Sequence, residues 1–291
     1  MASLRIKIQH GLQAYYHVFT KVTQNLYGLK TEKEKEAFLV LLRILQKTFF
    51  IDFLAFQIMD NHFHLLLKTN PVETIDPEEA KARFLNIFPN GNFCTEKIPE
   101  YLAKWADLSY FMKTLNERFA VGYNRRNDKQ GHFWAGRFKS TILADRESIL
   151  HCMAYIDLNA VRAGMVENPE EHVYGSIGYV VERKNEGNLV NISEIGVQLD
   201  CLKKEKEEEV EKSPRGLEHL SSQERLIYTR YMAFVELKRK EGFLGKIAIF
   251  ARQAILGMRE HIEAILDRLN HRKRWNFRKL SFLGSAFTAT C

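Results

Sequence analysis

The chain has 291 residues, 45% hydrophobic and 27% charged, a composition typical of a globular protein with one large or two modest domains. No run approaches the roughly 18 apolar residues of a membrane span, and the N-terminus lacks a secretory signal, so we expect a cytoplasmic protein without a membrane partner. The four cysteines lie far apart, which excludes a disulfide framework and a cysteine-built zinc module. A net charge of +7 favours a polyanionic partner.

The first half of the chain alternates strand-like and helix-like segments. Residues 14–23 are rich in aromatic and β-branched residues and predict a strand. Apolar residues at helical spacing predict a helix over 32–48, and residues 50–68 then predict two strands that turn at 59–61. The Pro- and Gly-containing segment 70–105 predicts an insertion of loops with one short helix over 77–85.

The segments that follow complete an α+β pattern. We expect a helix over 106–124, an extended basic and aromatic hairpin over 130–143, and a helix over 145–159 with Asp145 as its N-cap. Strands interleaved with helices in this order indicate a sheet core that is not doubly wound. We assign this catalytic domain to residues 1–181.

A change in composition after residue 181 predicts a second region. The dense mixed charges of residues 182–215 are typical of a linker. Ser221 and Glu224 form a capping box that opens a helix to about residue 240, and a further helix is expected after Gly257. Residues 216–291 are therefore predicted to be a helical basic accessory region. The alternative is that this region folds back and covers an apolar face of the catalytic sheet.

The accessory region ends in a basic segment. Residues 245–280 carry nine basic and three acidic residues, with aromatic residues between them. This pattern suits a nucleic-acid-binding arm, with Arg272, Lys273 and Arg274 as its expected contacts. A solvated helix face would give the same composition.

The pair His62 and His64 is the sharpest chemical feature. Successive strand residues point to opposite faces, so both imidazoles project to one side and Phe63 to the other. Two imidazoles on one strand face can supply two ligands of a metal site. Two half-exposed sheet histidines without a metal are the alternative.

Tyr155 and Asn159 form a second feature on the helix expected over 145–159. They are four residues apart and share a helix face, with His151 one turn earlier. An amphipathic helix with a half-buried Tyr hydroxyl is the alternative interpretation.

A third feature combines cations with aromatic rings over residues 124–139. Arg and Lys can follow the phosphates of a single strand while aromatic faces stack on its bases. The expected DNA contacts here are Arg125, Arg126, Trp134, Arg137 and Lys139. A hairpin with an aromatic core face and a basic outer face is equally compatible with the pattern.

These features in this order resemble the HUH-superfamily single-tyrosine transposases, closest to the REP-associated tyrosine transposase (RAYT) branch. HUH denotes two histidines that flank a hydrophobic residue. The resemblance spans residues 15–179 and rests on four blocks: Tyr16-His17-Val18, Asn61-His62-Phe63-His64-Leu65, Gly136-Arg137-Phe138-Lys139-Ser140, and the segment from Tyr155 to Gly164. Departures occur at Asp60, where the family commonly has Pro, at Ala160, where it has Pro after Asn, and at residues 20–24, where it has a Gly-containing segment.

The resemblance implies a ferredoxin-like or RRM-like antiparallel sheet with packed helices. It further implies that His62, His64 and Asn159 bind a divalent metal, Mg²⁺ or Mn²⁺, whereas histidine ligands by themselves suit Zn²⁺ or Mn²⁺. Tyr155 maps onto the nucleophile, with Tyr15, Tyr16 and Tyr123 as other candidates. No nucleotide cofactor is implied, and the protein is expected to be a monomer or homodimer.

The expected activity is cleavage of single-stranded or hairpin-associated DNA through a 5′-phosphotyrosine link, followed by rejoining to a free 3′-OH. A metal-dependent hydrolase that activates water at the histidine pair is one alternative. A nucleic-acid-binding protein without catalysis is the other.

Overall fold

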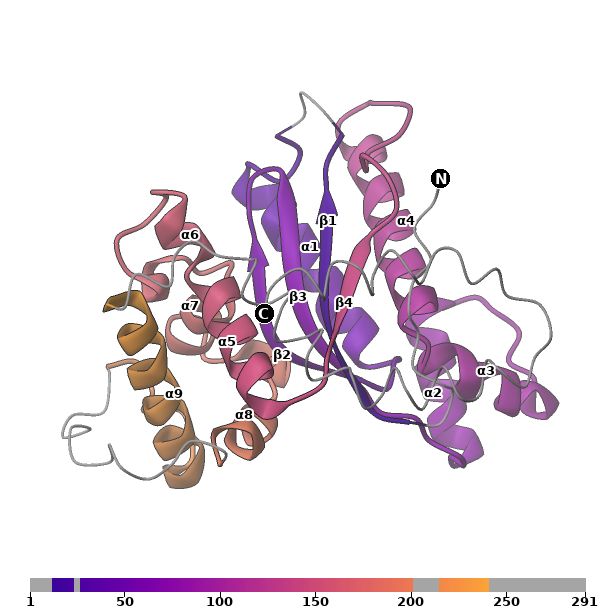
Figure 1. The fold of residues 1–291 in the computed structure, drawn as a ribbon. Coiled ribbons are helices and arrows are strands. Elements are labelled where there is room, and N and C mark those ends of the chain that lie inside the picture. The colour runs from indigo at the N-terminus through magenta and orange to yellow at the C-terminus, as the bar shows by residue number, and fades with distance from the viewer. Residues whose placement is uncertain (1–11, 24–26, 201–214, 241–291) are drawn as a thin grey trace, which may run out of the picture. The chain divides into compact units, whose positions relative to one another are not determined.

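A computed structural model describes residues 12–23, 27–200 and 215–240 of the chain (Figure 1). These residues all belong to the first of the chain's two compact units, Met1–Ala254. Within this described part, no helix has the length and apolarity needed to cross a membrane.

The core is a four-stranded antiparallel sheet in the order β2-β3-β1-β4. Its strands are β1 (Ala14–Lys21), β2 (Ile51–Ile58), β3 (His62–Thr69) and β4 (Lys139–Leu143). Helix α1 (Glu32–Gln46) connects β1 to β2, and helix α4 (Leu108–Arg126) precedes β4. This β-α-β-β-α-β order is the ferredoxin-like arrangement, which confirms the predicted fold class.

One face of the sheet packs against α1 and α4. The ring of Phe63 lies 4.7 Å from that of Phe38 on α1, and Phe38 lies 5.1 Å from Phe119 on α4. All three side chains are buried, and burial of one such ring stabilises the fold by about 1.5–3 kcal/mol. Because Phe63 points to this side, its neighbours His62 and His64 point to the other.

The opposite face of the sheet is covered by α5 (Arg146–Asp157), which contacts β2 and β3 (Figure 1). Asp145 caps this helix, as the sequence predicts, by accepting a hydrogen bond from the backbone N–H of Ser148 at 2.7 Å. The chain continues through α6 (Asn159–Arg162), the 3₁₀ turn η2 (Pro169–Glu171), α7 (Ser176–Val181) and the 3₁₀ turn η3 (Glu186–Asn188).

The segment predicted as a loop-rich insertion contains two helices and a 3₁₀ turn. These are α2 (Pro77–Ile87), η1 (Thr95–Lys97) and α3 (Ile98–Trp105). The sequence predicts only the first, because Pro99 suggests a break. Pro99 instead occupies the first turn of α3, where a backbone N–H has no intrahelical acceptor. Aromatic rings then hold the segment together, with Tyr101 5.5 Å from Trp105 and 5.2 Å from Phe84.

The prediction of a hairpin over 130–143 is wrong. Within it only Lys139–Leu143 form a strand, and that strand pairs with β1. Before it, Trp134 forms an isolated antiparallel bridge with Val22, and Phe133 packs 5.3 Å from Phe119 and 4.4 Å from Tyr123. The aromatic side chains of a segment can be buried against a helix as well as within a hairpin. The spacing of apolar residues in the sequence does not distinguish the two arrangements.

The last described element, α9 (Ser222–Lys240), packs against α8 (Ile192–Leu199) and α5. The capping box is confirmed: the N–H of Glu224 donates to Ser221 Oγ, and the N–H of Ser221 donates to the Glu224 carboxylate. The hydroxyl of Tyr231 donates to Asp157 on α5, and both residues are buried. Residues 222–240 therefore pack on two helices that precede them in the chain, and coverage of the sheet itself by the C-terminal region stays a prediction. Helix α8 lies inside the segment predicted as a linker, and the boundaries at residues 181 and 215 stay predictions.

Candidate active site

The two histidines of the HUH motif lie at the start of β3 on the face that α5 covers. The antiparallel register places His62 opposite Lys21 and His64 opposite Phe19 on β1. The two imidazole rings have centroids 5.1 Å apart, and Phe19 stacks on His64 at 4.8 Å. The structure therefore places both rings on one side of the sheet, as the strand alternation predicts.

Each of these histidines is oriented by a hydrogen bond at Nδ1. His62 Nδ1 lies 2.7 Å from Asn61 Oδ1. An amide oxygen only accepts, so Nδ1 carries the proton and Nε2 carries the lone pair. His64 Nδ1 lies 2.9 Å from Nε2 of His17 on β1. When His64 donates in this bond, its Nε2 also carries a lone pair.

Both imidazoles are held in the neutral form. Burial, with Lys21 and Arg162 nearby, lowers the pKa of His62 to about 4. Burial, with His17 and His62 nearby, lowers the pKa of His64 well below its usual value. Neutral imidazole is the form that binds metals. The two rings therefore fit the predicted role of metal ligands.

Tyr155 reaches the histidines from α5. Its side chain is buried, and its ring lies 5.8 Å from His64 and 6.1 Å from His17, edge-on to both. Some 90 residues separate the motif on β3 from Tyr155, so this proximity is a product of the tertiary fold.

The helix predicted over 145–159 ends at Asp157 and Asn159 begins α6, yet Asn159 still lies next to Tyr155. One atom shows this directly: Nη2 of Arg162 donates to the Tyr155 hydroxyl at 3.1 Å and to Asn159 Oδ1 at 2.9 Å. Asn159 is buried, and its Nδ2 has no hydrogen-bond partner among the described residues. Nor do these residues bring three or more His, Cys, Asp or Glu side chains together as metal ligands. The predicted metal site therefore depends on the Asn159 amide as its third protein ligand.

Three side chains at this site were not assigned a chemical role from the sequence. These are His17, Lys21 and Arg162. His17 shares the strand face with Phe19, two residues on, and Arg162 follows Tyr155 by seven residues, two helical turns. Both spacings were visible in the sequence, but the pairing of β1 with β3 was needed to place His17 beside His64.

The predicted DNA contacts fall into separate groups. Lys139 is exposed and pairs with Phe19, so it lies on the face that carries His64. Arg125 and Arg137 are exposed. Arg126 forms an ion pair with the buried Glu34.

Trp134 packs on the opposite face of the sheet, 5.4 Å from Phe63, and its indole N–H donates to the carbonyl of Asn116. These contacts give Trp134 a packing role, and stacking on DNA stays a prediction for it. Arg272, Lys273 and Arg274 lie outside the described residues.

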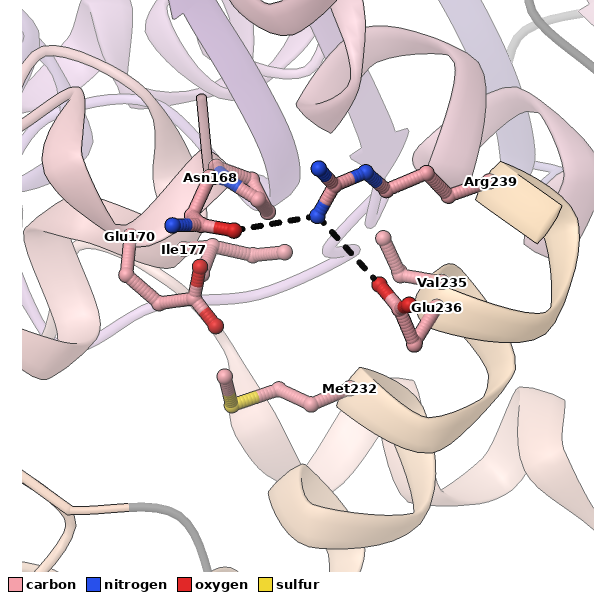
Figure 2. Close-up of a pocket in the computed structure, with 8 residues that line it drawn as sticks. Asn168, Glu170, Ile177, Met232, Val235, Glu236 and Arg239 are labelled. Atoms are coloured by element: carbon pink, nitrogen blue, oxygen red, sulfur yellow. Dashed lines mark hydrogen bonds and ion pairs between the residues drawn. The ribbon is translucent and has the colours of Figure 1, made fainter. Parts of the chain in front are cut away.

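A small pocket lies between η2, α7 and α9 and is separate from these residues (Figure 2). Arg239 from α9 reaches across it to Asn168 Oδ1 at 3.0 Å and also pairs with Glu236. No residue predicted to act in catalysis or DNA binding lines the pocket.

No family model and no curated protein matches the chain. One solved structure with a similar chain is a REP-associated tyrosine transposase bound to a REP hairpin. The two chains are 12% identical, the match covers 66% of this chain and 89% of that chain, and the TM-score is 0.44.

Proposed function

We propose that this protein is a metal-dependent HUH nuclease and strand transferase that cleaves and rejoins single-stranded, hairpin-associated DNA through Tyr155. The observation that carries the proposal is the 5.8 Å approach of the Tyr155 and His64 rings. This approach places a potential nucleophile on α5 beside a pair of neutral imidazoles on β3. A packing role by itself does not require a Tyr, two His and an Asn to share one polar site.

The chemistry follows from the residues present. The hydroxyl oxygen of Tyr155 attacks the scissile phosphorus, the P–O3′ bond breaks, and a 5′-phosphotyrosine and a free 3′-OH result. The phosphotyrosine bond conserves the energy of the broken bond, so a second 3′-OH can reverse the step and join new ends. His62, His64 and Asn159 would hold a divalent metal, which would neutralise phosphate charge when bound.

The charges around the site favour a phosphodiester. The positive charges of Lys21 and Arg162 help to lower the pKa of His62 and of His64, and Lys139 lies on the same sheet face. Cations around a nucleophile attract a DNA strand and orient its phosphates. A soluble transposase of this kind would act in the cytoplasm.

A protein–DNA adduct assay tests the proposal. The protein is incubated with Mg²⁺ or Mn²⁺ and a labelled pool of single-stranded oligonucleotides that carry a central hairpin and randomised flanks. We expect an adduct that survives denaturation. Tyr155→Phe removes only the hydroxyl and should abolish the adduct while DNA binding persists.

Tyr110→Phe is the matched control, because Tyr110 lies on α4 and its ring packs against Phe49. It should form the adduct at the unsubstituted rate. An adduct formed by Tyr155→Phe would remove Tyr155 from the mechanism. Metal-dependent cleavage without an adduct would indicate the hydrolase instead, and DNA binding with neither would indicate a non-catalytic binding protein.

A further inference from the structure

Arg162 occupies a position that the function proposed above does not yet use. It is the last residue of α6, three residues after Asn159 on the same helix and seven after Tyr155 on α5. Its Nη2 atom donates to the Tyr155 hydroxyl at 3.1 Å and to Asn159 Oδ1 at 2.9 Å. Its guanidinium carbon lies 4.6 Å from the centroid of the Tyr155 ring.

Two of the contacts that Arg162 makes are with uncharged groups. Its Nη2 atom donates to a phenol and to an amide. Its charge also reaches the histidines, where it helps to lower the pKa of both His62 and His64.

The residue remains accessible to a ligand. Arg162 is exposed, whereas Tyr155 and Asn159 beneath it are buried. A guanidinium is planar, permanently charged and able to donate to two phosphate oxygens at once. A phosphate that approaches the Tyr155 hydroxyl from solvent therefore meets Arg162.

We propose that Arg162 is a further catalytic residue, whose guanidinium binds the scissile phosphate and stabilises the charge that develops when Tyr155 attacks it. This inference rests on the function proposed above and assigns the group that receives the phosphate. As the Tyr155 oxygen bonds to phosphorus, the bond from phosphorus to the 3′ oxygen breaks. The phenolic proton leaves to solvent and the 3′ oxygen takes one up. Arg162 donates hydrogen bonds throughout and neither gains nor loses a proton.

A purely structural role for Arg162 is the competing explanation. By bridging Tyr155 and Asn159, the guanidinium could do no more than fix their side-chain orientations. The two roles predict different responses to free guanidinium ion in a variant that lacks Arg162. Free guanidinium ion can take the place of a lost charge at a phosphate, but it does not restore the orientation of a helix.

The test measures the single-turnover rate of adduct formation at saturating DNA, with DNA affinity measured separately. Arg162→Ala is expected to lower the rate about 10²–10³-fold, the effect of removing one donor that stabilises a transition state, and to weaken DNA binding much less. Millimolar guanidinium should restore part of the lost rate. Arg162→Lys should retain an intermediate rate, because the charge remains but the two-pronged geometry is lost.

Arg162→Gln gives an independent variant, because its amide can still donate to Tyr155 and Asn159 but carries no charge. It should be as slow as Arg162→Ala. Arg239→Ala is the control, since Arg239 contacts Asn168 and Glu236 at the separate pocket. It should keep the unsubstituted rate and show no response to guanidinium.

The outcomes separate this inference from the proposed function. Adduct formation by Arg162→Ala at the unsubstituted rate overturns the role of Arg162 and leaves that of Tyr155 intact. A loss that guanidinium does not restore also overturns it, in favour of the structural role. If the unsubstituted protein forms no adduct, the proposed function fails and this inference fails with it.

Discussion

Nε2 of His17 on β1 lies 2.9 Å from Nδ1 of His64 on β3, and when His64 donates in this bond its own Nε2 carries the lone pair. Burial lowers the pKa of His17 to about 4, so His17 is neutral and can accept the His64 proton at neutral pH. Such a partner orients a metal-binding imidazole and fixes its tautomer.

Removing this partner should weaken metal binding. We expect His17→Ala to lower the affinity for Mn²⁺ about 10–100-fold, the usual effect of losing the group that orients a metal ligand. His17→Gln should lose less, because its amide oxygen can still accept from His64. The exposed His219 provides the control variant His219→Gln. Calorimetric titration with Mn²⁺ measures all three, and an unchanged affinity in His17→Ala would contradict the prediction.

The ligands themselves should show a graded effect. His62→Ala and His64→Ala are each expected to lose most of the activity and to bind Mn²⁺ more weakly, because each removes a direct ligand. Asn159→Ala should be milder, since a neutral amide oxygen is the weakest of the three donors. Adduct yield and Mn²⁺ calorimetry test this order. Normal metal affinity in both histidine variants would return these residues to the role of sheet histidines without a metal.

The salt dependence of DNA binding should locate the strand on the protein. Arg137→Ala and Lys139→Ala should each flatten the slope of log affinity against log salt by about 0.7, the value for one lost phosphate contact on a single strand. Arg126→Ala should change the slope less, because Arg126 already pairs with Glu34. Fluorescence anisotropy from low to high salt measures the slopes. Slopes equal to that of the unsubstituted protein would place the DNA elsewhere.

The buried Asp157 should make stability depend on pH. Burial raises its pKa to about 7, although Ser176 and Tyr231 both donate hydrogen bonds to it. The folded state therefore binds its proton more tightly than the unfolded state does. This contribution is fully present below about pH 4 and is lost as the pH rises towards 7.

Asp157→Asn removes that titration. As the pH rises from 4 to 7, the free energy of unfolding of the unsubstituted protein should fall relative to that of the variant, by up to about 4 kcal/mol. Urea unfolding at both pH values measures the difference, in which the opposing effect of the histidines cancels. A difference that does not change with pH would show that Asp157 stays ionised in the folded protein.

Shortened chains should distinguish the two interpretations of the C-terminal region. A chain that ends at Val181 loses α8 and α9, including the buried Tyr228 and Tyr231. We expect it to aggregate or to melt at a lower temperature. A chain that ends at Lys240 keeps both helices and should stay folded and retain cleavage, with weaker and less salt-sensitive DNA binding. A stable and active chain ending at Val181 would instead support an accessory region that begins there.

The sequence by itself determined the local features of this protein. Strand alternation placed His62 and His64 on one face, and the four-residue spacing placed Tyr155 beside Asn159. Asp145 and the pair Ser221 and Glu224 specified two helix starts. All of these depend on interactions between residues that are close in the chain, whose geometry follows from the helical and strand periods.

Only the tertiary structure decided which of these features meet. The pairing of β1 with β3 brings His17 to His64, and the packing of α5 on the sheet brings Tyr155 to the same place. It also packed Trp134 against the core on the face opposite the histidines and joined α9 to α5 through Asp157. Such contacts join residues far apart in the chain. Burial and strand register across the whole domain select them, and no local pattern in the sequence encodes that selection.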